Sequence, residues 1–411
     1  MEKKRLLVIG SGSENYRRYI LETAVQMGLE IILVSNRSAT WEIGLCKKII
    51  FSNIDNAAAM YERLSKSIDI NSINGIFTYV EEAVYPTAQL AQILGLPFIS
   101  VQTAQAARNK YVMRKRFEES GLKTPNYVKI RSIEDLQYAQ DSLKLPVVIK
   151  PIDGWGSIGV IKVEKWEELK GIFEKISKNK FTETEPTFIL EEYLIGNEVS
   201  VESVIFNKKI HHYGIVQKYI CNEPYFEEVG HSFPAELPDD LIENTLNVTA
   251  KGIEALGINS GVTHTELRLT PSGPVIVEIG ARLGGDKIPY LIQLATGINL
   301  ARNAIKVALG QNPDFEYKFI KGSAIKFFVP PSSCEILEYP DFVDVIKLSN
   351  VHELRFKPPF GLLKVPPEGF FTRMGYVVTC DITGEKAYKT ACTAEDLIKI
   401  KYVEAEEVNP S

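Results

Sequence analysis

The sequence has few cysteines and no long apolar run. Its cysteines are an odd number and form no CxxC pair, which argues against a disulfide framework or a zinc site; they are Cys46, Cys221, Cys334, Cys380 and Cys392. No apolar run approaches the roughly 18 residues of a membrane span. The first run stops at Ile9, and this is too short for a signal-peptide core of about 7–15 residues. We therefore expect a reduced, cytoplasmic protein without a membrane partner.

An excess of basic residues is also missing. The chain has 47 basic and 52 acidic residues, a net charge of −5, so there is no electrostatic reason to expect a nucleic-acid partner. With 45% apolar and 24% charged residues, a disordered or fibrous chain is excluded. The 411 residues allow about two to four domains, and we expect a monomer or homodimer.

The first 105 residues alternate short apolar runs with helical patterns. The expected strands are Arg5–Gly10, Glu30–Ser35, Lys48–Ser52 and Gly75–Val80, and the expected helices include Tyr19–Met27 and Ala57–Leu64. Strands that alternate with helices pair in parallel. We therefore expect an open, Rossmann-like α/β domain over residues 1–105, followed by a helix that begins near Ala106.

Three further regions follow, and we expect them at residues 106–200, 201–314 and 315–411. The second region contains the expected strands Leu145–Pro151 and Phe188–Glu192 around a helix over Lys165–Ser177. The third contains two strands, Gly261–Leu269 and Pro274–Ile279, joined by a turn-forming cluster typical of hairpins. The last region is β-rich and is expected to end in a strand, a turn, a strand and a helix from Thr393.

The glycine turn after the first strand resembles part of a dinucleotide-binding fingerprint. It begins at Gly10 and Gly12, but Asn15 replaces the third glycine. The end of the second strand carries Arg37, which could meet a 2′-phosphate, but no acid for a ribose hydroxyl. A tight strand-to-helix turn is therefore favoured over NADP binding.

Lys150 ends an expected buried strand, where an ammonium group is expensive to desolvate unless an anion meets it. A glycine-rich loop that includes Gly156 and Ser157 follows, and its backbone N–H groups can wrap phosphate oxygens. Lys110, on the preceding helix, could bring a second positive charge. The alternative is a surface hairpin with two solvated lysines.

An acidic segment comes next. Glu191, Glu192, Tyr193 and Leu194 follow a run of apolar residues, and Glu198 lies just beyond. A carboxylate here could accept from an adenine amino group, backbone groups could read the ring edge, and Glu198 could bind ribose hydroxyls. Acids after a strand are otherwise solvated.

Two further acids lie at the centres of the strands in the expected hairpin. Antiparallel pairing would place Glu266 and Glu278 side by side, where they repel each other unless a cation sits between them. Mg²⁺ bound to phosphate is the natural cation. Arg282, in the following glycine-containing loop, could stabilise a developing anion. The alternative is a surface salt bridge of these acids with Arg268 or Arg282.

Taken in order, these signals resemble the ATP-grasp superfamily of carboxylate–amine ligases over nearly the whole chain. The resemblance implies a Rossmann-like N-terminal domain (1–105), a small nucleotide-lid subdomain (106–200), a large subdomain with the metal site (201–314) and a β-rich C-terminal cap (315–411). It also implies roles for individual residues: Lys110 and Lys150 on ATP phosphates, Gly156 and Ser157 in a mobile phosphate loop, Glu191, Glu192, Tyr193 and Leu194 on adenine, Glu198 on ribose, and Glu266 with Glu278 on two Mg²⁺ ions, which Mn²⁺ could replace.

The sequence departs from the pattern of the superfamily at one position, and this departure points to a subgroup. Many members carry Asn two residues after the second metal-binding Glu, whereas this sequence has Gly280 there and lacks that third ligand. The E-x-x-A-R-x-x-G run after an H-T-E strand is similar to the bacterial L-amino acid ligases. This similarity implies catalytic roles for Arg282 and Gly285, and substrate contacts from Arg282, Glu228 and His231. Alternatively, His231 is a simple loop histidine.

The resulting hypothesis is an ATP-dependent ligase. It would join the carboxylate of one L-amino acid to the amine of another through an acyl phosphate, releasing ADP and phosphate. Acids within Cys221–Asp240 would favour a cationic first amino acid, although a solvated loop explains them equally well. The alternatives are a ligase for a different carboxylate and amine, a non-catalytic nucleotide-binding protein and, more remotely, an NADP-dependent reductase.

Overall fold

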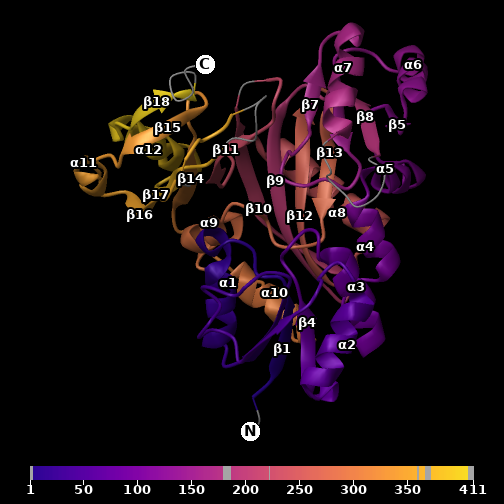
Figure 1. Cartoon of the computed structure of the whole chain (residues 1–411), viewed down its shortest axis with the longest axis vertical. Helices are drawn as coiled ribbons and strands as arrows, with labels where there is room; N and C mark the ends of the chain where they lie inside the picture. The colour runs from indigo at the N-terminus through magenta and orange to yellow at the C-terminus, as the bar shows by residue number, and fades with distance from the viewer. Residues whose placement is uncertain (1–2, 179–186, 222, 359–360, 366–371, 406–411) are drawn as a thin grey trace.

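The computed structural model describes residues 3–178, 187–221, 223–358, 361–365 and 372–405 (Figure 1). Within these ranges the strands form four sheets, and none of the helices is long and apolar enough to cross a membrane. The first sheet is parallel, with the order β3-β2-β1-β4. The elements of this N-terminal part are β1 (Arg5–Ile9), α1 (Glu14–Gln26), β2 (Glu30–Ser35), β3 (Lys48–Phe51), α2 (Ala57–Ser67), the 3₁₀ turn η1 (Ile70–Ser72), β4 (Ile73–Phe77), α3 (Val84–Leu94) and α4 (Val101–Arg108). The predicted mixed α/β class is confirmed.

The helix expected from near Ala106 is in fact two helices. The first, α4, ends at Arg108, and α5 (Lys110–Glu119) begins at once. Asn109 separates them because its backbone is extended and its side chain accepts a hydrogen bond from the Val112 N–H, which caps α5. Lys110 is therefore the first residue of a new helix.

A small antiparallel sheet follows, with the order β5-β8-β6-β7. Its elements are β5 (Tyr127–Ile130), α6 (Ile133–Ser142), β6 (Val147–Pro151), β7 (Ile161–Val163), α7 (Trp166–Ser177) and β8 (Phe188–Glu192). Both helices pack on one face of this sheet through an apolar cluster that includes Leu136, Leu169 and Phe173. The opposite face of this sheet lines the cleft described below.

The large sheet has the order β13-β12-β9-β10-β11-β14-β17-β16. Its strands and the elements near them are β9 (Asn197–Phe206), β10 (Lys209–Ile220), β11 (Glu228–Phe233), α8 (Asp239–Ala255), β12 (Gly261–Thr270), β13 (Gly273–Gly280), α9 (Ile288–Thr296), α10 (Leu300–Ala308), β14 (Gly322–Phe328), β15 (Cys334–Glu338), α11 (Val343–Ile346), β16 (Val351–Phe356), β17 (Gly375–Asp381), α12 (Gly384–Leu397) and β18 (Lys401–Glu404). Strands from both sides of residue 314 share this sheet, and the boundaries at 105, 200 and 314 stay predictions.

The expected ending of the tail was wrong. The segment expected to hold a second strand and then a helix from Thr393 forms the single helix α12. Thr383 caps it by accepting a hydrogen bond from the Lys386 N–H. Ala387, Ala391 and Ala394 are buried at helical spacing, so the packing of this small-residue face decides in favour of a helix.

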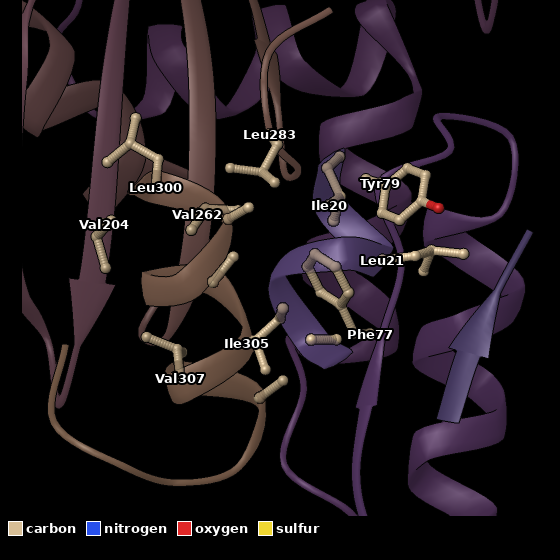
Figure 2. Packing of buried hydrophobic residues seen from close by; sticks show 14 of the residues in the cluster. Ile20, Leu21, Phe77, Tyr79, Val204, Val262, Leu283, Leu300, Ile305 and Val307 are labelled. Carbon is tan, nitrogen blue, oxygen red and sulfur yellow. The ribbon is translucent and has the colours of Figure 1, made fainter. Parts of the chain in front are cut away.

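One apolar core joins the N-terminal part to the large sheet (Figure 2). Ile20 and Tyr79 come from the N-terminal part, and Val262 and Ile305 come from β12 and α10. Leu283 belongs to the same cluster and is almost completely buried. This core therefore fixes the loop after β13, which begins with Ala281 and Arg282.

Candidate active site

A single cleft gathers most of the residues predicted from the sequence. It encloses about 1040 Å³, its open mouth included, which is at the upper end of the range for small-molecule sites. Every predicted site residue except Gly285 and His231 lines it. The predicted residues in its wall are Lys110, Lys150, Gly156, Ser157, Glu191, Glu192, Tyr193, Leu194, Glu198, Glu228, Glu266, Glu278 and Arg282. The small sheet, the glycine loop and the large sheet all contribute.

Lys110 links the glycine loop to the large sheet. Its ammonium donates to the Gly154 carbonyl at 3.0 Å and lies 3.0 Å from Oε2 of Glu278. Burial of this side chain makes an unpaired charge expensive, so Glu278 is its counter-charge in the absence of an anion. The loop itself uses left-handed backbone, with φ of 62° at Gly156 and 58° at Ser157.

Lys150 is held by a buried carboxylate. Its ammonium lies 2.6 Å from Oε2 of Glu191, and the Arg114 Nε lies 2.8 Å from Oε1 of the same group. Although burial opposes ionisation, Arg114 and Lys150 lower the pKa of Glu191 to about 2. Both oxygens of Glu191 are therefore committed to cations. In the structure this carboxylate holds the Lys150 ammonium, and its contact with adenine stays a prediction.

The neighbouring wall is apolar and aromatic. Val148, Ile158, Val160, Leu194 and Phe226 line it. The ring of Tyr193 lies 6.1 Å from that of Phe226, and the Lys162 ammonium lies 4.5 Å from the Tyr193 ring centroid. The carboxylate of Glu192 accepts from Asn126 and from the Lys144 N–H, so a ligand would meet mainly the backbone and apolar atoms of this segment.

Glu266 and Glu278 are cross-strand partners on β12 and β13, as predicted. A register shift directly after this pair marks a local bulge. One oxygen each from Glu266, Glu198 and Glu228 lies within 4.8 Å of the other two. This all-carboxylate donor set suits Mg²⁺, so Glu198, Glu228 and Glu266 fit a divalent ion, and Glu278 stays a predicted ligand beside them. Gly280 offers no side-chain ligand.

Lys218 occupies the centre of that carboxylate group. Its buried ammonium lies 2.6 Å from Glu198 and 2.7 Å from both Glu228 and Glu266. Despite burial, these acids raise the pKa of Lys218 well above its ordinary value. Burial likewise opposes the ionisation of Glu266, yet Lys218 and His264 hold its pKa well below the usual range. The ammonium thus holds three carboxylates close together.

Arg282 is paired with a carboxylate from the N-terminal part. Its Nε donates to Glu81, and Arg108 donates to the other oxygen of Glu81 at 2.8 Å. Arg108 also reaches the Asp153 carbonyl at 2.6 Å. Against the effect of burial, Arg282 and Arg108 lower the pKa of Glu81 to about 2. A buried acid after β4 thus fixes the guanidinium that was predicted to be catalytic.

Two predicted residues lie outside the wall. The His231 ring is buried, and its Nε2 lies 3.2 Å from Asp286 and 3.6 Å from Glu228. It can therefore position these acids but does not reach the cleft itself. Gly285 is next to Gly284 in the loop after β13, and a Cβ at Gly285 would meet no atom within 4 Å. Neither residue contacts the cleft directly.

The acids of the segment Cys221–Asp240 do not form one acidic pocket, because they contact different cations. Glu227 lies 3.4 Å from Arg373, and Glu228 is paired with Lys218. Glu223 accepts from Tyr193 and Lys162 at the rim. Neither Glu227 nor Glu228 therefore offers a free negative charge to a cationic substrate in the structure.

Arg37, considered above for a 2′-phosphate, folds back onto its own turn. It lies 2.5 Å from the buried Glu42 and donates to the Gly12 carbonyl at 2.6 Å.

Sequence reasoning missed Glu81, Arg108, Arg114 and Lys218. Glu81 follows the end of a parallel strand, the edge at which ligands of open α/β sheets bind, so its position was a usable signal. Lys218 lies on a strand that mixes apolar residues with His211, His212 and Gln217, so its local sequence does not mark it as buried in the way that the apolar run before Lys150 does. Arg114 carried no such signal, because nothing in a polar helix marks one arginine as completely buried.

Comparisons with known proteins agree with this geometry. Residues 143–290 match the model of the ATP-grasp domain, and residues 21–98 match that of the ATP-grasp N-terminal domain. A crystal structure of an L-amino acid ligase from Bacillus licheniformis superimposes with a TM-score of 0.86 at 24% identity, covering 98% of this chain and 100% of that one.

Two curated relatives are also ligases. Alanine–anticapsin ligase from Bacillus amyloliquefaciens is 26% identical over 266 residues, which are 60% of this chain but only 56% of that protein. The L-arginine-specific L-amino acid ligase of Bacillus subtilis is 21% identical over 74% of each chain. The two matched domain models together span more than half of the chain and show that it belongs to the ATP-grasp superfamily.

Proposed function

We propose that the chain is an ATP-dependent ligase that joins the carboxylate of one L-amino acid to the amine of another. One observation carries the proposal: two lysines, a cross-strand pair of carboxylates and a fixed arginine face the same cleft. Phosphoryl transfer needs positioning and charge neutralisation more than covalent help from the protein, and these groups supply both. The ligase relatives favour amino acids as substrates.

We assign the nucleotide to the cleft between the small and large sheets. The apolar wall around Leu194 would hold adenine, and Glu198 would accept from ribose hydroxyls. The ammonium groups of Lys110 and Lys150 would turn from their carboxylate partners to phosphate oxygens, together with backbone N–H groups of Gly156 and Ser157. Glu266 and Glu278 would hold Mg²⁺, which neutralises phosphate charge when bound.

In the first step, a carboxylate oxygen of the first amino acid attacks the γ-phosphorus of ATP, and the bond to ADP breaks. The amine nitrogen of the second amino acid then attacks the acyl carbon. Arg282, fixed by Glu81, would stabilise the oxyanion of the tetrahedral intermediate. This intermediate loses phosphate, and the nitrogen releases a proton to give the amide. Closure of the glycine loop would exclude water from the acyl phosphate.

The test is ADP release with Mg²⁺ across all pairs of the twenty amino acids, with the products read by mass spectrometry. Formation of a condensed dipeptide supports the proposal. ADP release only with other carboxylates and amines would identify a different ligase, and nucleotide binding without turnover would identify a non-catalytic protein. Glu278→Gln is the matched inactive variant.

A further inference from the structure

Arg17 is a partly buried arginine without an acidic partner. It lies in α1, where Nη1 donates to the Gly284 carbonyl at 2.9 Å and the guanidinium lies 5.7 Å from the Tyr79 ring centroid. Among the described residues no carboxylate lies within ion-pair distance of it. The next residue, Arg18, is by contrast paired with both Glu14 and Glu22. A desolvated cation of this kind is expensive unless an anion meets it.

Arg17 and Arg282 meet on the same loop. Arg282 donates to the Leu283 carbonyl at 2.8 Å, and Arg17 donates to the carbonyl of the very next residue, Gly284. Burial and the charge of Arg282 both lower the pKa of Arg17. Two guanidinium groups so close together repel each other, and this repulsion is relieved when an anion binds beside them.

The nearby acids are already occupied. Glu81 is shared by Arg282 and Arg108, and the two oxygens of Asp286 lie 2.6 and 2.9 Å from Arg373. One carboxylate cannot balance two guanidinium groups, and Arg17 adds a third that has no carboxylate within ion-pair distance in the described part of the chain. Arg17 does not itself line the cleft, but its hydrogen bond to Gly284 places it next to the loop of Arg282, the arginine that we assign to the acyl-transfer step.

The chemistry of an amino acid defines which anion fits. In an α-amino acid only two bonds separate the nitrogen from the carboxylate carbon. When the amine attacks an acyl carbon at Arg282, its own carboxylate must therefore lie within a few ångströms of that centre. We propose that Arg17 binds the α-carboxylate of the amine-donating amino acid. The proposal rests on the proposed ligase function and extends it to the second substrate.

The test compares a free amino acid with its primary amide as the second substrate. The amide keeps the nucleophilic amine but lacks the negative charge. Removing a hydrogen bond between charged groups reduces binding by roughly 10- to 100-fold. In Arg17→Gln, kcat/KM for the free acid should fall by about that factor relative to the amide, through KM, and Arg17→Lys should recover part of the loss. Arg18→Gln is the matched control and should leave the acid-to-amide ratio unchanged.

Equal losses with acid and amide in Arg17→Gln would overturn the assignment and make Arg17 a structural residue. Failure of the ligase function would be recognised separately, with the wild-type chain. There, hydroxylamine replaces the second amino acid and traps the acyl phosphate as a hydroxamate. A wild-type chain that forms no hydroxamate from any amino acid would overturn the proposed function, and with it the carboxylate site.

Discussion

Replacing Lys218 with Met removes the buried ammonium at the centre of three partly buried carboxylates. Breaking a buried ion pair by removing one partner typically destabilises a protein by about 3–5 kcal/mol, because an uncompensated charge remains. Each acid has a second cation: Arg268 lies 2.8 Å from Glu198, His264 lies 3.2 Å from Glu266, and His231 lies 3.6 Å from Glu228. We therefore expect the lower end of that range, about 3 kcal/mol.

The assay is urea unfolding followed by circular dichroism, with and without Mg²⁺. Because the carboxylate oxygens remain close enough to share a cation, Mg²⁺ should replace the lost ammonium. At 100 times its Kd, a ligand stabilises the folded state by about 2.7 kcal/mol, so Mg²⁺ should protect Lys218→Met far more than the wild type. Lys326→Met, which loses a partly exposed pair with Glu395, is the control and should lose at most about 1 kcal/mol. A Lys218→Met chain that unfolds at the wild-type urea concentration, or gains no extra protection, would refute the reasoning.

Three other predictions concern single carboxylates. Glu278→Gln should reduce ADP release on the order of 100-fold, since an amide is a poor Mg²⁺ ligand, while the circular dichroism spectrum stays unchanged; retained turnover would exclude the metal role. Glu81→Gln should reduce kcat by roughly 10- to 100-fold through misplacement of Arg282, with little change in ATP affinity measured by calorimetry, and an unaltered kcat would contradict this. Burial raises the pKa of Glu227 to about 7, so its folded state holds a proton that the unfolded state has already lost above about pH 4.5. The free energy of unfolding should therefore fall as pH rises from about 4.5 to about 7, by about 3 kcal/mol. Glu227→Gln should remove this decline in urea titrations, and parallel pH profiles would show that Glu227 is not its cause.

The sequence predicted well wherever one local pattern determines the structure. The hairpin that pairs Glu266 with Glu278 follows from alternating apolar strands around a turn cluster, and its register is confirmed. The tail was misread because the residues of α12 include β-branched and aromatic types, and only the packing of Ala387 and Ala391 against the sheet selects a helix.

The site residues that the sequence analysis did not predict were missed for a different reason. Glu81 is 201 residues from Arg282, and Lys218 is 48 residues from Glu266, so each contact exists only after separate elements have packed. No spacing rule connects positions so distant. The ion pair of Glu191 has the same cause, since Glu191 lies on β8 and its partner Arg114 comes from α5. A sequence motif predicts which residue type stands at a position. Which side-chain atoms of that residue are free to bind a ligand depends on the tertiary contacts.

The contact between Glu81 and Arg282 has a consequence for engineering. Exchanging the first 105 residues with those of a related ligase, to import a new amine specificity, would also exchange the counter-ion of the arginine. A donor segment without an acid at this position would leave Arg282 and Arg108 repelling each other beneath the bound substrates. Chimeras of this chain should therefore be designed with the acid and the arginine inherited as one unit.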